Sequence, residues 1–251
     1  MGAETIILLL IIGFVGGVLN AVAGGSSLIT FPALMAMGLP PVVANATNFF
    51  GLIASNAAAL PAYRNELHEI IPQIIPLLIL SGIGGLAGAL LLLVSDPGVF
   101  VTLIPFLILF ATLMFAFGDR VKVWLDGLHA GRLLGLTILF FSAIYGGYFG
   151  AGLGIILLAV VQIFGFKDYN RANAIKNLLG TYFSIISVVI FGIGGLINWP
   201  FAAVMVVGST IGGYSGGVLA KRFDNTTLRK ALIIYGLILS AIYFLRNLGA
   251  I

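Results

Sequence analysis

The chain is a succession of apolar runs separated by short polar or glycine-containing breaks. Ten runs can be marked along the 251 residues, five in each half. The first half predicts helical segments at 5–23, 26–37, 41–62, 70–94 and 99–117. The second half predicts segments at 132–150, 152–164, 170–196, 199–220 and 228–245. Because most of these runs are long enough to cross a hydrocarbon core of about 30 Å, the pattern predicts an all-α integral membrane protein.

The breaks recur at corresponding positions in the two halves. Gly24-Gly25-Ser26-Ser27 separates the first two runs, and Gly150-Ala151-Gly152-Leu153-Gly154 separates the sixth and seventh. In each half the second run is too short to cross a bilayer comfortably at about 1.5 Å per residue. Short, glycine-interrupted segments at matching positions are typical of transporter binding sites. We therefore expect two repeats of about five segments, each opening with a Gly-broken helical hairpin that either crosses the membrane or re-enters.

Basic residues predict how the segments are oriented, because cytoplasmic loops carry an excess of Lys and Arg. If each opening hairpin returns to its own side, the basic loops fall on one side: Arg64; Arg120, Lys122 and Arg132; Lys167 and Arg171; Lys221, Arg222, Arg229 and Lys230. Only Arg246 departs from this pattern. Each half then contributes an odd number of crossings, so the repeats are inverted and both termini are non-cytoplasmic. The repeats would cover 1–118 and 132–251, joined by a solvated cytoplasmic connector at 119–131.

Composition supports a membrane protein and excludes several function classes. Hydrophobic residues make up 61% of the chain and charged residues 8%, against about 25% charged in soluble domains. The absence of cysteine excludes disulfides, thiolate metal sites and a cysteine nucleophile. The 12 Lys and Arg residues are scattered at predicted helix ends, which argues against nucleic-acid binding. The first run follows Glu4 rather than a positive start, so we interpret it as a retained helix and not a cleaved signal.

The glycine breaks predict an anion site near the middle of the membrane. Unwound backbone at membrane depth is tolerated only where protein or a water-filled cavity surrounds it. Helices beginning near Ser26 and Gly154 would direct their N-terminal N–H groups and partial positive charge into one central region. The alternative is close helix packing through small residues.

Polar residues on two further segments strengthen this prediction. Asn45 and Asn48 share one helical face, which continues to Ser55 and Asn56. In the second half Asn173 and Asn177 do the same, and the stripe continues to Thr181 and Ser184. Such residues are costly in a membrane helix, so they face inward. They either bind substrate or form hydrogen bonds between helices.

Lys176 is the most specific single signal. It lies about one turn inside an apolar helix that contains no acidic residue, so a bound anion is the natural counter-charge. The alternative is that its ammonium group extends to the cytoplasmic interface near Asp168 and Arg171.

Other chemistry lacks support in the sequence. His68 and His129 lie in predicted loops, with Glu66 and Glu69 in the hydrated loop beside Arg64. No metal, cofactor or nucleophile set can be assembled, and no P-loop or hydrolase motif is present. All eight acidic residues lie at predicted helix ends or in loops, so the coupling ion, protons included, stays open, as does the oligomeric state.

At these positions the chain resembles the sulfite exporter TauE/SafE family, also called the toluene sulfonate uptake permease (TSUP) family. The resemblance covers nearly the whole chain and is carried by five segments: Gly13-Phe14 through Gly24-Gly25-Ser26, Phe31-Pro32-Ala33-Leu34 with Gly38-Leu39-Pro40, Ala44-Asn45-Ala46-Thr47-Asn48, Gly150-Ala151-Gly152-Leu153-Gly154 and Ala172-Asn173-Ala174. Ser26-Ser27 stands where members often continue with glycines. The resemblance implies transport of sulfite, sulfoacetate or other sulfonates across a prokaryotic cytoplasmic (inner) membrane.

The sequence thus predicts a secondary transporter, not an enzyme, that carries a small organosulfur oxyanion by alternating access between two inverted repeats. An anion channel or uniporter of the same architecture, for another small oxyanion or a carboxylate, is the first alternative. A membrane scaffold without substrate would leave two costly polar clusters unexplained. The candidate substrate-binding residues are Asn20, Gly24, Gly25, Ser26, Ser27, Asn45, Thr47, Asn48, Gly150, Gly152, Gly154, Asn173, Lys176 and Asn177.

Overall fold

A computed structural model describes residues 1–127, 131–220 and 226–248, which form helices and connecting turns without strands. The elements are α1 (Ala3–Ala23), α2 (Ser27–Ala36), α3 (Pro41–Ala59), the 3₁₀ turn η1 (Leu60–Tyr63), α4 (Arg64–Val94), α5 (Pro97–Gly127), α6 (Arg132–Tyr148), α7 (Leu153–Ile163), α8 (Tyr169–Ile193), α9 (Trp199–Leu219) and α10 (Thr226–Asn247). Six helical stretches in the described part are long and apolar enough to cross a membrane. The prediction of an all-α multi-pass membrane protein is confirmed.

Two helices extend well beyond their predicted bounds. α4 begins at Arg64 rather than at 70, so the predicted loop that holds Glu66, His68 and Glu69 is helical, and that part of the prediction was wrong. α5 continues past 117 to Gly127, through most of the predicted connector. Both extensions carry charged residues, but Glu, Lys and Arg are good helix formers, so the helices continue past their apolar runs. Lys221, Arg222 and His129 lie outside the described residues.

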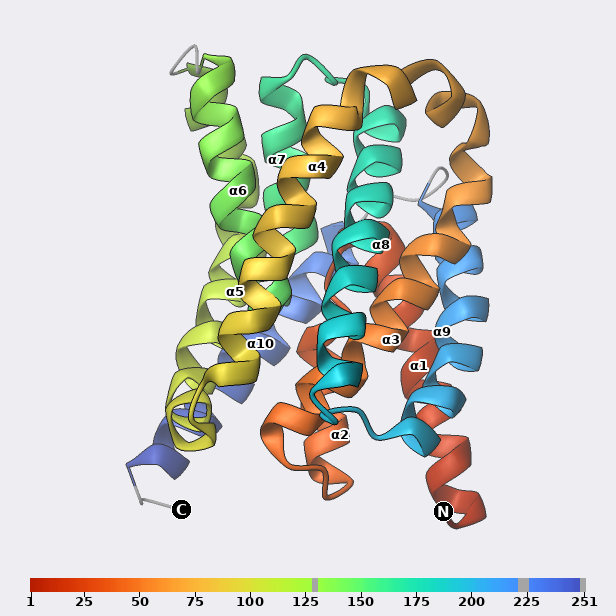
Figure 1. The fold of residues 1–251 in the computed structure, drawn as a ribbon, viewed down its shortest axis with the longest axis vertical. Helices are drawn as coiled ribbons and strands as arrows, with labels where there is room; N and C mark the ends of the chain where they lie inside the picture. Colours follow the sequence, from red (N-terminus) through yellow and green to blue (C-terminus); the bar gives the residue numbers. More distant parts are fainter. Residues whose placement is uncertain (128–130, 221–225, 249–251) are drawn as a thin grey trace.

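The helices run roughly along the long axis of the molecule (Figure 1). The start of α1 and the end of α10 lie at the same end of the bundle, together with the α2–α3, α4–α5 and α8–α9 turns (Figure 1). The turns after α3 and α7 lie at the opposite end. α1 and α2 both reach the end that holds the termini, whereas α6 and α7 both reach the other end (Figure 1). Each of these helix pairs therefore turns back inside the molecule.

Helices from the two halves of the chain interleave through glycine contacts. α1 packs on α9 so closely that a Cβ atom at Gly212 would clash with the carbonyl oxygen of Phe14. α6 packs on α4 in the same way, and a Cβ atom at Gly88 would clash with the carbonyl oxygen of Ile144. Such backbone-to-backbone contact requires small residues. The sequence carries a signal for this packing that the repeat prediction did not use: Ile-Gly-Gly-x-x-Gly occurs at 83–88 and again at 211–216.

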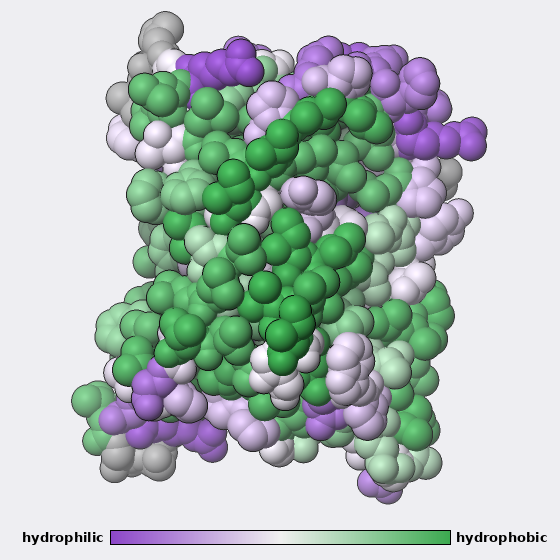
Figure 2. All heavy atoms as spheres, in the orientation of Figure 1, coloured by the Kyte–Doolittle hydropathy of each residue, from purple (hydrophilic) through white to green (hydrophobic). Residues whose placement is uncertain are grey.

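The outer surface and the interior differ sharply in polarity. On the face shown in Figure 2, hydrophobic residues cover the middle of the molecule and hydrophilic residues gather toward both ends. Inside, α3 and α8 pack against each other and carry a set of fully buried polar side chains, among them Asn45, Asn48, Asn173 and Asn177. The polar interior lies where the two turned-back helix pairs meet.

Candidate functional site

The two glycine breaks are in direct contact. Gly24 follows α1 with φ +75°, and Gly152 precedes α7 with φ +71°, a backbone region that glycine adopts without a steric penalty. A Cβ atom at Gly154 would lie 2.5 Å from the Cα atom of Gly24. The end of α1 and the first turn of α7 therefore touch through bare backbone.

Three side chains of α8 bind the carbonyl groups that end α1. The Tyr169 hydroxyl donates to the Val22 oxygen at 3.2 Å, and the Asn173 amide donates to the Ala21 oxygen at 3.3 Å. The Lys176 ammonium donates to the Asn20 and Ala21 oxygens at 3.0 and 2.9 Å. These side chains follow each other at spacings of four and three residues, so they lie on one face of α8. They supply donors to carbonyls in the last turn of α1, where a helix leaves carbonyl groups without its own partners, although the Asn20 oxygen also accepts from the Gly24 backbone N–H.

Lys176 sits neither at the interface nor against a carboxylate. Its side chain is 2% exposed, so it does not extend to the surface as the alternative interpretation required. Within the described residues Lys176 forms no ion pair. The negative end of the α1 dipole and its carbonyls stabilise the ammonium. An ammonium has three donors, and the carbonyl groups occupy two directions of approach, which leaves capacity for one further acceptor.

A small cavity lies beside this lysine. Its volume is about 20 Å³, and its walls include Gly24, Gly154, Lys176 and Ser184. That volume holds about one water molecule, so little free space is left beside the lysine in this conformation.

Two asparagines and a serine form a hydrogen-bonded wall on the α1–α3 side. The Asn20 amide donates to the Ser55 hydroxyl at 2.8 Å and to the Asn56 side-chain oxygen at 2.9 Å. Asn20 and Asn56 both line the small cavity. Ser55 and Asn56 continue the stripe that the sequence indicated on this helix, although they were not among the candidate binding residues.

On the α8 side several buried groups have no partner. Neither polar atom of the Asn177 amide forms a hydrogen bond within the described residues, and the same holds for the Ser184 hydroxyl. Asn177 and Ser184 are 0% exposed and seven residues apart, on one face of α8. A buried polar group without a partner costs about 1–3 kcal/mol. Such groups call for an explanation, and binding of a water molecule or a ligand is the usual one.

Most of the corresponding groups in the first half are occupied by protein contacts; the Asn45 side-chain oxygen is an exception, with no partner within the described residues. The Asn48 amide donates to the Ser27 hydroxyl at 2.8 Å, and its oxygen accepts from the Thr30 hydroxyl at 2.5 Å. The Asn45 amide donates to the Tyr148 carbonyl at 2.8 Å, near the end of α6. The Thr30 hydroxyl also donates to the Ser26 carbonyl. These residues form hydrogen bonds between helices, which was the alternative open to them.

Of the remaining candidate binding residues, one lines the small cavity and the others pack elsewhere. Gly150 lines the small cavity. Thr47 accepts from the Asn198 backbone N–H at 3.0 Å, at the start of α9. Gly25 packs against the Phe115 ring, and Gly152 packs against Ala111. Sequence-based prediction missed Tyr169, although its spacing from Asn173 and Lys176 was a signal that could have been used.

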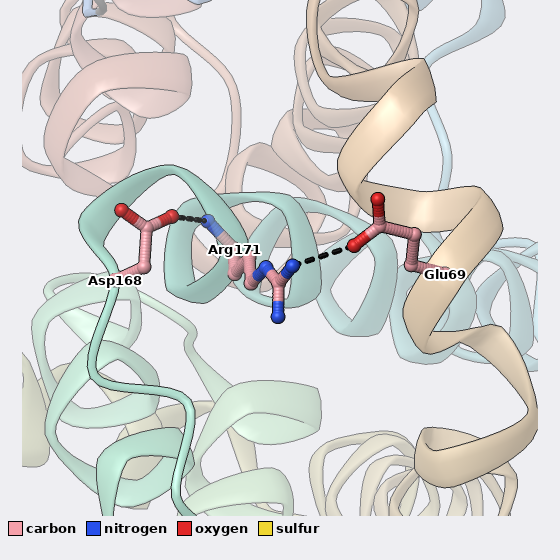
Figure 3. Close-up of polar contacts among 3 residues, drawn as sticks. All are labelled: Glu69, Asp168 and Arg171. Atoms are coloured by element: carbon pink, nitrogen blue, oxygen red, sulfur yellow. Dashed lines mark hydrogen bonds and ion pairs between the residues drawn. The ribbon is translucent and has the colours of Figure 1, made fainter.

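The beginning of α8 is fixed by exposed polar contacts. The Asp168 side chain accepts from the Arg171 backbone N–H at 2.9 Å and caps the helix. Arg171 also forms an ion pair with Glu69 of α4, with 2.5 Å between Nη2 and Oε2 (Figure 3). The two side chains are 47% and 60% exposed, so the pair contributes at most about 1 kcal/mol. These contacts position the helix that carries Tyr169, Asn173 and Lys176.

Comparison with known proteins gives consistent results along nearly the whole chain. The sequence model of the family described as "Sulfite exporter TauE/SafE" matches residues 9–244. A "Probable membrane transporter protein" of Haemophilus influenzae is 31% identical over 246 residues, which cover 96% of this chain and 95% of that protein. The "Probable membrane transporter protein ORF9" of Sinorhizobium sp is 26% identical, covering 92% and 89% of the two chains. The "Probable membrane transporter protein YfcA" of Escherichia coli K12 is 27% identical, covering 93% and 87%. No solved structure matches the chain.

Proposed function

The chain belongs to the sulfite exporter TauE/SafE family and is a membrane transporter rather than an enzyme, and from this premise we propose that it is a secondary transporter for a small sulfur-containing oxyanion. Sulfite, sulfoacetate and other organosulfonates are the substrate class. The transporter acts in the cytoplasmic (inner) membrane of a prokaryote. The observation that carries the proposal is the buried Lys176 ammonium, which lines the small cavity together with the Ser184 hydroxyl and adjoins Asn177 in the sequence; the Ser184 hydroxyl and the Asn177 amide have no partner within the described residues.

The chemistry of this site suits an SO₃⁻ group. Such a group offers three acceptor oxygens, and charge-assisted hydrogen bonds to them are about twice as strong as neutral ones. Lys176 has donor capacity left after its two carbonyl contacts, and the Asn177 amide has two unused N–H donors. The ammonium also supplies the counter-charge that an anion needs at membrane depth.

Substrate binding and release require the site to open. The cavity of about 20 Å³ is too small for a sulfonate, so the site must widen before it can hold the substrate. In this proposal the two turned-back helix pairs are the Gly-broken, re-entrant hairpins of two inverted repeats, with both termini non-cytoplasmic. In support, α1–α2 and α6–α7 reach opposite ends of the molecule (Figure 1). Separation at the Gly24–Gly154 contact would open the site in turn to each side.

The units that move differ from the two halves of the sequence. α1 packs on α9, and α6 packs on α4, so each hairpin is attached to a helix of the other repeat. Alternating access then moves a body of α1, α2, α3 and α9 against a body of α4, α6, α7 and α8, with the α3–α8 contact between them.

The proposal is tested with purified protein and with proteoliposomes. Sulfite, sulfoacetate, thiosulfate, sulfate, arylsulfonates and acetate are compared for their effect on the melting temperature, and the strongest stabiliser is then used as a labelled substrate. We expect a sulfur oxyanion to stabilise most and to show saturable uptake with counterflow. Uptake that does not saturate would indicate a channel, preference for acetate would indicate a carboxylate transporter, and no response to any oxyanion would reject the proposal. A C-terminal tag that is accessible only from the cytoplasm would reject the orientation.

A further inference from the structure

A second cavity lies on the other side of the Gly24–Gly154 contact. Its volume is about 220 Å³, an order of magnitude larger than the central cavity. Its inner wall is the end of α1, at Val22 and Ala23, and the first turn of α7, at Ile155. These residues directly adjoin Gly24 and Gly154, which line the central cavity. The two cavities are therefore separated by the backbone contact between the helix pairs. We call the larger one the vestibule.

The charged wall of the vestibule is positive on balance. Arg229 from α10 and Lys122 from α5 line it, together with one acidic residue, Asp119. The Arg229 guanidinium donates to the Phe115 carbonyl and forms an ion pair with Asp119. The Arg229 side chain is 24% exposed, whereas that of Asp119 is 81% exposed. The cation is held at the cavity, while its carboxylate partner faces largely toward solvent and can be displaced.

An amide group adds further hydrogen-bond donors to the wall of the vestibule. Gln162 of α7 lines the cavity and is 8% exposed. No hydrogen bond of its side chain is found within the described residues, and its amide atoms are not among the sealed polar atoms that lack a partner, so the amide group is open to the cavity. Guanidinium, ammonium and amide groups together suit an oxyanion, because each supplies N–H donors.

We propose that the vestibule is a second anion site, where the transported sulfur oxyanion binds to Arg229, Lys122 and Gln162 before it passes the Gly24–Gly154 contact. The Asp119 carboxylate competes with the substrate for Arg229. It pairs with the guanidinium when no substrate is bound, and the substrate oxygens replace it on binding. The inference rests on the proposed function, since the ligand is the transported anion. In this scheme the vestibule binds the anion first, and the central cavity is the site through which the anion crosses the membrane.

The test measures KM and kcat for uptake of the sulfur oxyanion identified above, with substrate supplied on the side that carries Arg229. Arg229→Gln and Gln162→Leu should each raise KM roughly tenfold and change kcat less than twofold, because a charge-assisted or buried hydrogen bond is lost at capture only. Asp119→Asn should lower KM, since the competing charge is removed. Lys230→Gln, a matched loss of charge at an exposed position of the same helix, should leave both constants unchanged.

Gln162→Leu keeps the test decisive even if Arg229→Gln folds poorly, because the Gln162 side chain has no hydrogen bond to lose within the described part of the chain. A purely structural role for these residues predicts an unchanged KM in Gln162→Leu and no decrease in Asp119→Asn. That result, with saturable wild-type uptake, rejects the vestibule site and leaves the proposed function intact. Wild-type protein without saturable uptake of any sulfur oxyanion rejects both.

Discussion

The two asparagine-bearing helices, α3 and α8, occupy similar positions but have different hydrogen bonds. Asn48 on α3 is fully engaged by the hydroxyls of Ser27 and Thr30 on α2. In the second half, α7 (LGIILLAVVQI) contains no residue with a hydroxyl group. The Asn177 amide on α8 has no partner within the described residues. Asn48 thus holds helices together, whereas Asn177 keeps hydrogen-bonding capacity that the proposed ligand could use.

The C-terminal ends of α1 and α6, which lie at the centre of the molecule, also have different partners. α6 ends against the neutral Asn45 amide, and α1 ends against the Lys176 ammonium together with Asn173 and Tyr169. The only buried cation within the described residues therefore lies on one side of the centre. The buried charge and the Asn177 amide are both carried by α8, which is why we locate the proposed anion site on this helix.

The strongest test of this asymmetry is removal of the buried charge. Lys176→Met should lower substrate uptake by at least roughly 100-fold, because the counter-charge for the anion is lost, and should lower the free energy of unfolding by about 1–3 kcal/mol, because the α1 carbonyls lose a donor. Uptake and thermal unfolding are measured on the same preparation. Lys167→Met, at an exposed position, is the matched control. Normal uptake by Lys176→Met would leave the lysine a structural cap only.

Paired substitutions of the two asparagines separate binding from packing. Asn177→Leu should abolish most uptake with unchanged or higher thermal stability, because no protein hydrogen bond of that amide is broken within the described residues. Asn48→Leu should lower the free energy of unfolding by about 1–3 kcal/mol, because the Ser27 and Thr30 hydroxyls lose their partner. Melting curves and initial uptake rates distinguish the two effects. If Asn48→Leu retained stability and Asn177→Leu lost it, the comparison between the helices would be reversed.

The contact between the two glycine breaks is tested by adding a single methyl group. Gly154→Ala should lower the free energy of unfolding by about 1–3 kcal/mol, the usual cost of overpacking, since the new Cβ atom would lie 2.5 Å from the Gly24 Cα atom. Gly192→Ala is the control in α8, because its nearest atoms are 3.7 Å away. Denaturant unfolding compares them. Equal stability of the two variants would mean that the breaks are not in contact.

The smallest effect is expected at the start of α8. Arg171→Ala removes the exposed ion pair with Glu69 and should lower the free energy of unfolding by no more than about 1 kcal/mol, an effect that weakens further at high salt. α3 begins at Pro41 without a capping side chain, so Pro41 variants should show no salt dependence. A large, salt-independent loss in Arg171→Ala would assign the guanidinium a role beyond this ion pair.

Local sequence patterns specify which segments are helical and where they break. Apolar runs and glycines act locally: a run long enough to cross the membrane must satisfy its own hydrogen bonds as a helix, and Gly24 or Gly150 permits a turn that other residues resist. The polar stripe on each asparagine helix could also be predicted, since helical spacing alone places its members on one face. The predicted bounds were wrong where charged residues that favour helix extend α4 and α5 beyond their apolar runs.

Long-range packing selects the partner that each polar residue meets. Lys176 binds the carbonyl of Ala21, 155 positions away in the chain, Thr47 accepts from Asn198, and Asn48 is satisfied by α2. Spacing along a helix fixes the direction of a side chain but not the helix that it faces. That choice follows from close packing of α1 on α9 and of α6 on α4 through glycine, a contact between distant segments that no local pattern specifies.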